Sequence, residues 1–239
     1  MLGQGRPPPP LTVFLVKMDT GITSSYSQAV LNPLPPSWLD RPDAPPSPPT
    51  WANIGVLSSN QIQCLLSQIA YDKSTWDYRK VGNNNQLGRY QFSSVILESY
   101  GLIANGSNDQ YGTGCVNYAH CWTPTFITDG INTYGNYFYN VTSLGSFLTN
   151  TATQEHLAYQ RVVDIYLTSL NSGVIFDTDT ADIVAGMIYV GWTLGVGGPQ
   201  TSSNPSGTGA WAWRNFNIGD YGTVSFNSGR YAVNALANK

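Results

Sequence analysis

The sequence has few charged residues. Asp, Glu, Lys and Arg make up 10% of its 239 residues, against about 25% in typical globular proteins. The net charge is −3, which offers no basic surface to a phosphate backbone, so we expect no nucleic-acid partner. Solubility must then rest on uncharged polar residues. This composition favours a subunit whose surface is covered by neighbours in an assembly, with an extracellular domain of neutral polar surface as the alternative.

Cysteine and histidine are also rare, with three and two copies. Cys115 and Cys121 are close enough in the sequence to form a disulfide in an oxidising environment, or they stay reduced and buried. Cys64 falls on the apolar face of a predicted helix. His120 and the two nearby cysteines offer only three ligands, whereas a structural zinc site needs four. We therefore expect no metal and no other cofactor. His156 is expected to be solvated on a helix, and neither histidine fits a catalytic triad.

Long apolar runs are missing as well. The run at residues 11–16 is far too short to cross a bilayer, so we expect no membrane insertion. The residues before it lack the pattern of a secretory signal peptide, and we expect none.

Proline is concentrated near the start of the chain. Clusters at residues 7–10, 33–36 and 44–49 exclude long helices and favour extended or polyproline conformations. We therefore predict two parts, an extended proline-rich arm at residues 1–52 and a globular domain at residues 53–239.

The arm has features of a docking segment. Residues 11–16 have the composition of a strand, and a lone strand needs a partner to be stable. Trp38, Leu39 and Trp51 supply apolar anchors that a linker does not need. We expect the arm to dock on another chain, with a disordered linker as the alternative.

Helical periodicity runs through the domain. A helix is predicted to begin at a Ser58 cap, with Gln61 three residues later, and to end at residues 72–75. Residues 103–139 are predicted to form a long irregular loop. The sequence predicts a mainly α domain. A short helix is expected after a Ser93 cap, with Val95, Ile96 and Tyr100 on its apolar face and Gly101 after its end. Further helices are expected from residue 144 to Gly173, over residues 178–195, and from about residue 228 near the C-terminus.

One stretch resembles a known family. Residues 61–101 contain a helix that ends in an acidic residue and Ser, then a polar connector. Gly-Arg-Tyr-Gln-Phe at 88–92 then opens a second helix, which Gly101 closes. This order is similar to the core of the lysozyme-like proteins of tailed phages, which include lytic transglycosylases related to the lambda-type endolysin and tail-associated versions in phages of cyanobacteria.

The likeness continues to about residue 235, starting near residue 57. Trp122 lies where the family has a Trp-containing loop. Phe-Leu-Thr-Asn at 147–150 precedes a Gln-Glu pair, and Gly-Val-Ile at 173–175 leads to Ile-Val-Ala-Gly at 183–186. The resemblance implies a lysozyme-like α+β fold.

The resemblance also implies an activity, cleavage of the β-1,4 bond between N-acetylmuramic acid and N-acetylglucosamine. This reaction needs a carboxylic acid to protonate the leaving oxygen. Aligned through residues 88–92, the family's catalytic Glu corresponds to Lys73. Three interpretations are open. Asp72 acts as the catalytic acid with help from Asp77 or Glu98, or the site is inactive. In the third, the alignment is shifted by one residue and Asp72 itself corresponds to the family's catalytic Glu.

Other residues are candidates for the substrate cleft. Tyr78, Tyr90, Gln91 and Trp192 could line it, because aromatic faces stack on sugar rings. Arg89 could contact substrate too, or pair with Asp72 or Asp77 and hold the loop.

We therefore expect a virion structural protein of a phage tail or baseplate, built on a lysozyme-like domain with a degenerate active site. Its partners would be other particle subunits, bound through the arm, and peptidoglycan. An active tail-associated muramidase or lytic transglycosylase is the first alternative, and a non-catalytic glycan-binding module is the second.

Overall fold

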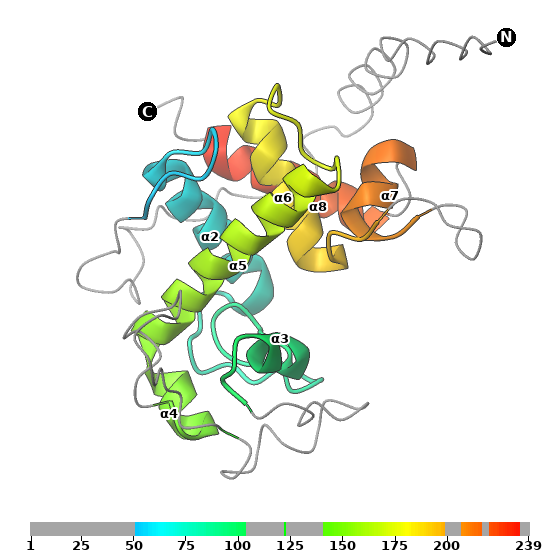
Figure 1. Ribbon diagram of the computed structural model, residues 1–239. Coiled ribbons are helices and arrows are strands. Elements are labelled where there is room, and N and C mark those ends of the chain that lie inside the picture. Colours follow the sequence, from blue (N-terminus) through cyan, green and yellow to red (C-terminus); the bar gives the residue numbers. More distant parts are fainter. Residues whose placement is uncertain (1–50, 104–121, 123–140, 199–206, 217–219, 235–239) are drawn as a thin grey trace, which may run out of the picture. The chain divides into compact units, whose positions relative to one another are not determined.

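The computed structural model describes residues 51–103, 122, 141–198, 207–216 and 220–234. The predicted arm before Trp51, most of the predicted 103–139 loop, Cys115 and Cys121 lie outside the described residues. The described residues are mostly helical, as predicted (Figure 1). Their helices are α2 (Ser59–Ser74), α3 (Ser94–Ser99), α4 (Leu144–Thr149), α5 (Thr151–Asn171), α6 (Ala181–Leu194), α7 (Gly209–Phe216) and α8 (Asp220–Asn234).

Helix α2 has the predicted ends. The Ser58 side chain accepts the Gln61 backbone N–H, and the Gln61 side chain accepts the Ser58 backbone N–H at 2.9 Å, so both orphan donors are satisfied. Thr75 follows in the left-handed conformation and ends the helix. Its apolar face is formed by Ile62, Leu65, Leu66 and Ile69, which are completely buried.

Residues 88–92 do not open a helix, so that prediction is wrong. Leu87 and Phe92 instead form an antiparallel bridge, with each backbone N–H donating to the other's carbonyl at 2.9 Å. The turn between them needs left-handed backbone at Gly88 (φ 72°) and Gln91 (φ 52°), which a helix excludes. Helix α3 begins only after the predicted Ser93 cap.

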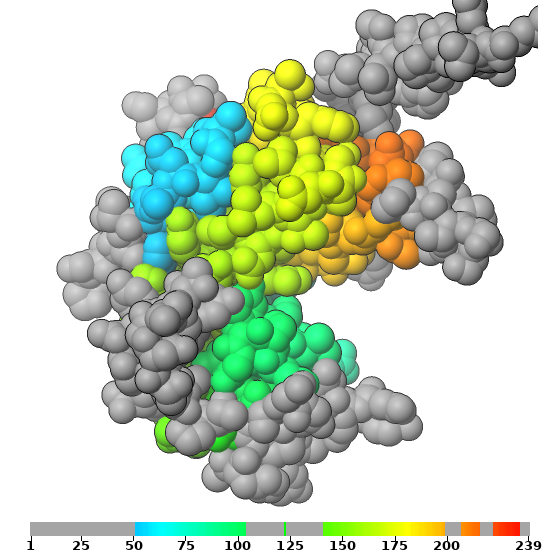
Figure 2. Space-filling view, in the orientation of Figure 1, coloured from blue at the N-terminus to red at the C-terminus, as the bar shows by residue number. Residues whose placement is uncertain are grey.

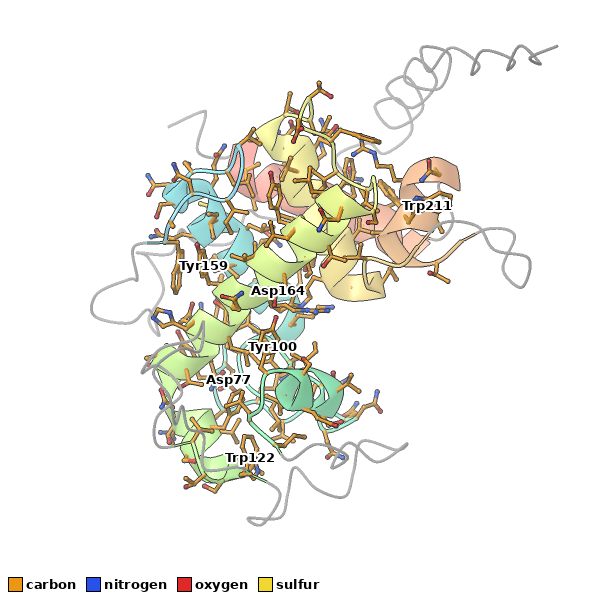
Figure 3. All side chains as sticks on the ribbon, viewed as in Figure 1. Asp77, Tyr100, Trp122, Tyr159, Asp164 and Trp211 are labelled. Atoms are coloured by element: carbon orange, nitrogen blue, oxygen red, sulfur yellow. The ribbon has the colours of Figure 1, made fainter. Side chains whose placement is uncertain are left out.

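Helix α3 also differs from its predicted face. Val95 is 56% exposed, whereas Leu97, not named in the prediction, is completely buried. Tyr100 is buried at the C-terminal cap, and its hydroxyl donates to Asp164 of α5 (Figure 3). Gly101 has φ 72°, as expected of the residue that ends this helix.

Helices α6 and α8 cross with close backbone contact. A Cβ added at Gly186 of α6 would lie 2.5 Å from the Phe226 ring, and one at Gly229 of α8 would lie 2.6 Å from the Ala185 carbonyl oxygen. Gly186 and Gly229 therefore allow the backbones of α6 and α8 to approach each other closely. Helix α8 begins at Asp220 and is longer than the predicted helix from residue 228.

Two ion pairs tie α7 and α8 to the beginning of α6. Both Arg214 Nη atoms donate to the Asp179 carboxylate at 2.9 Å. Arg230 donates to one oxygen of Asp182 through Nε and Nη2, at 2.8 and 2.7 Å. These pairs fix the register of the C-terminal helices on α6.

The start of the described chain packs on α5. The Trp51 ring stacks on Tyr159 at 4.6 Å and meets the His156 ring edge-on at 4.9 Å. The Tyr159 hydroxyl donates to the Ala52 carbonyl at 3.2 Å. Figure 2 shows this blue segment against the yellow-green surface of α5. His156 is half-buried here, which corrects its predicted solvation, and burial lowers the pKa of its imidazole to about 4.

This contact predicts a pH dependence. The folded chain holds the His156 pKa near 4, below its ordinary 6.5, so the unfolded chain binds more protons between these values. Stability should therefore fall as the pH drops from 6.5 to 4. An NMR titration of the imidazole, assigned with His120→Asn, should give a pKa near 4, and Trp51→Ala should raise it. A wild-type value near 6.5 would contradict this contact.

Candidate functional site

A buried carboxylate holds the loop between α2 and α3. Asn150 caps α5, and the next turn places Glu155 inside the protein with 1% exposure. Its Oε1 accepts the Tyr78 hydroxyl at 2.6 Å and its Oε2 accepts the Tyr90 hydroxyl at 2.7 Å. Arg89 Nε lies 3.3 Å from Oε1, and its side chain is fully buried. Three loop residues thus converge on one α5 side chain.

Gln154 reinforces this arrangement. Its Oε1 accepts the Arg89 backbone N–H at 2.8 Å, and its Nε2 donates to the Tyr78 and Phe147 carbonyls at 3.1 and 3.0 Å. A Cβ added at Gly88 would lie 2.2 Å from Gln154 Oε1, so the turn needs glycine here. The Gln-Glu pair of the resemblance therefore positions the 88–92 turn.

The network changes the roles expected for three residues. Tyr90 is fully buried and Tyr78 is 7% exposed, so neither ring lines an open cleft as predicted. Arg89 pairs with Glu155, and the predicted pairing with Asp72 or Asp77 is wrong. Burial, reinforced by the charge of Glu155, raises the pKa of Tyr90 well above its ordinary value, so the phenol stays a donor.

Gln91 and Trp192 keep partial exposure. Gln91 Nε2 donates to the Gly88 carbonyl at 2.7 Å and to the Lys80 carbonyl at 3.2 Å. The Trp192 ring lies 6.0 Å from that of Phe92. Gln91 therefore braces the turn, while the half-buried Trp192 packs next to it through Phe92.

Asp72 lies in the last turn of α2 and is linked to α6. Its Oδ1 accepts Gln68 Nε2 at 3.0 Å, and its Oδ2 accepts the Tyr189 hydroxyl at 2.5 Å. Burial, with the charge of Asp72, raises the pKa of Tyr189 well above its ordinary value. Both carboxylate oxygens therefore already accept a hydrogen bond from the protein. Sequence reasoning did not identify Tyr189.

Lys73 is the half-buried neighbour of Asp72. Burial lowers the pKa of its amine, against the opposing charge of Asp72. Among the described residues the amine has no hydrogen bond or ion pair, whereas the Lys73 carbonyl accepts Lys80 Nζ at 3.0 Å. Asp72 and Lys73 are therefore adjacent in the last turn of α2.

Two further acids, Asp77 and Glu98, were candidates to assist Asp72. Asp77 is exposed and accepts the Arg79 backbone N–H at 2.8 Å, which closes a local turn (Figure 3). Glu98 is half-buried on α3. Ser74, which follows Lys73, is buried and donates to the Arg89 carbonyl at 2.6 Å, so the end of α2 is joined directly to the 88–92 turn.

The described part of the chain shows no group of three or more His, Cys, Asp or Glu side chains that could hold a metal ion. None of its helices is long and apolar enough to cross a membrane. Comparisons with protein-family models, curated proteins and solved structures give no match. The arrangement joins a fully buried scaffold at Glu155 to a polar site at Asp72, Lys73 and Tyr189.

Proposed function

We propose that the chain is a structural protein of a phage tail or baseplate, built on a lysozyme-like domain that no longer cleaves glycan. The observation that carries this proposal is Lys73. At the position that the resemblance assigns to the catalytic Glu, the chain has a half-buried amine.

The chemistry supports an inactive site. Glycoside cleavage needs a carboxylic acid that delivers a proton to the leaving oxygen. Lys73 has no carboxyl group. Asp72 lies one residue earlier on a shorter side chain, and its two oxygens accept hydrogen bonds from Gln68 and Tyr189. Angstrom-scale misplacement of a catalytic group costs orders of magnitude in rate.

The internal contacts of Glu155 support the proposal that the domain has a structural role. The Glu155 network positions the 88–92 turn through internal contacts, and the Lys73 side chain takes no part in them. A chain with 10% charged residues also suits a subunit covered by neighbours.

A cell-wall assay tests the loss of catalysis. Wild type, Asp72→Ala and Lys73→Glu are incubated with purified peptidoglycan, and turbidity and soluble muropeptides are followed. The wild type is expected to release nothing. Lys73→Glu restores a carboxylate at the family position and is the variant in which any activity should first return. Lys80→Glu makes the same charge change at a neighbouring half-buried lysine and should stay silent.

Muropeptide release by the wild type that is lost in Asp72→Ala would support the active enzyme instead. The assembly part of the proposal has its own test. A chain without residues 1–50 should fold but fail to join particles, and normal incorporation would count against a docking arm.

A further inference from the structure

The described chain begins with a strap, residues 51–57, that lies along one stripe of α5. The stripe consists of His156, Tyr159 (labelled in Figure 3) and Tyr166, which project from the same side of the helix. Trp51 packs on the first two rings. Gly55 lies so close to the third that an added Cβ would be 2.2 Å from the Tyr166 hydroxyl oxygen. The strap therefore follows α5 from His156 toward its C-terminal half.

The backbone hydrogen bonds of the strap are local. The Trp51 N–H donates to Ser59 Oγ at 3.2 Å, and Ile54 and Leu57 exchange backbone hydrogen bonds at 3.0 and 2.9 Å. These bonds stay within the strap and the start of α2, whereas the strap meets α5 through aromatic rings and one tyrosine hydroxyl. A segment near a chain end that is held in this way can open without the rest of the domain.

A charge on His156 would act directly on this contact. The Trp51 ring meets the half-buried imidazole edge-on at 4.9 Å. Burial lowers the pKa of His156 to about 4, so the closed strap disfavours the protonated ring. Lifting the strap returns the imidazole to water, where it takes up a proton at its ordinary pKa of 6.5. Acid therefore favours the open strap.

The groups around His156 do not balance a positive charge there. Residues 51–57 include no acidic or basic residue, and the first turn of α2 has no acid. Burial raises the pKa of Tyr159, so this phenol stays neutral in acid. Glu155 precedes His156 on α5, but its carboxylate is turned inward to two tyrosine hydroxyls and Arg89.

We propose that acid releases residues 51–57 from α5 through protonation of His156, while the rest of the domain stays folded. Residues 1–50 join the domain through this strap, so its release lengthens their tether by seven residues, at most about 25 Å. The inference rests on the contacts of the strap and does not depend on the proposed function.

Hydrogen exchange of the full chain measures this opening. Exchange rates at pH 7 and pH 5, each divided by the intrinsic rate at that pH, give opening constants for the Ile54 and Leu57 amides. Because the pKa of His156 is about 4 in the closed strap and 6.5 in water, the opening constant should rise about 20-fold from pH 7 to pH 5. Amides inside α6, such as that of Ile188, report unfolding of the whole domain and should stay at least about tenfold better protected.

Two histidine variants test the titrating group. His156→Phe keeps a ring against Trp51 but cannot be protonated, so the rise between pH 7 and pH 5 should vanish. His120→Asn removes the other histidine of the chain and should keep the rise. Protection of the α6 amides confirms that both variants are folded.

Two glycine variants test the strap without a change of pH. Gly55→Ala places a methyl group against Tyr166 and should raise the strap opening constant at least about fivefold at pH 7, the lower end of the cost of overpacking. Gly101→Ala is the matched control. Its backbone is also left-handed, with φ 72° against 54° at Gly55, but an added Cβ meets no atom within 4 Å, so the strap should open as in the wild type.

Three results would overturn the inference: a rise of less than about threefold in the wild type, an undiminished rise in His156→Phe, or equal opening constants for the strap and α6 amides. The last result would mean that the strap leaves α5 only when the whole domain unfolds.

Discussion

Glu155→Ala is expected to lower the free energy of unfolding by about 3–5 kcal/mol, the range for removing one partner of a buried ion pair. The carboxylate is 1% exposed and accepts both the Tyr78 and Tyr90 hydroxyls. Without it, the fully buried Arg89 side chain loses its counter-charge and two phenols lose their acceptor. Helix α5 would then release the loop that carries the 88–92 turn.

Urea unfolding followed by tryptophan fluorescence measures this loss. Asp177→Ala removes a carboxylate from an exposed position and should stay within about 0.5 kcal/mol of wild type. Glu155→Gln should fall between them, because it keeps an acceptor but not the charge. Pairing Glu155→Leu with Arg89→Met should recover part of the loss, because no charge is then left buried. A Glu155→Ala loss below 1 kcal/mol would contradict the structure.

Helix α2 could be predicted from sequence signals that lie within the helix itself. The Ser58 capping box and the apolar face of α2 are contained in a single run of residues, so sequence order alone finds them. The 88–92 segment was mispredicted because its conformation depends on two left-handed residues, Gly88 and Gln91, and on Gln154 far along the chain. Non-glycine left-handed residues give no clear sequence signal.

The candidate site, too, could be predicted from the sequence only where its residues are neighbours in one element. Asp72 and Lys73 are neighbours on one helix, so their proximity follows from helical geometry. Tyr189 is 117 residues from Asp72, and only tertiary packing brings them together. Glu155 was visible in the Gln-Glu motif, but an acidic residue on a helix is normally expected in solvent. The sequence does not show that two tyrosines and an arginine surround Glu155, so its role in holding the loop could not be predicted.

The close crossing of α6 and α8 gives the second large prediction. Gly229→Ala should cost about 1–3 kcal/mol, the usual range for overpacking a core. The added methyl would lie 2.6 Å from the Ala185 carbonyl oxygen and 2.9 Å from Gly186 Cα. Both are backbone atoms of α6, so no side chain can rotate away, and the helices must separate.

Gly145→Ala provides a control in which the added methyl group meets no clash. Gly145 also lies in a helix, but its nearest neighbour would be Ser143 Oγ at 4.0 Å. Without a clash, alanine has the higher helix propensity, and the variant should be unchanged or slightly more stable. In thermal or urea unfolding, Gly229→Ala should therefore be less stable than wild type, while Gly145→Ala should be as stable or slightly more stable. A Gly229→Ala chain as stable as Gly145→Ala would mean that α6 and α8 do not meet at this crossing.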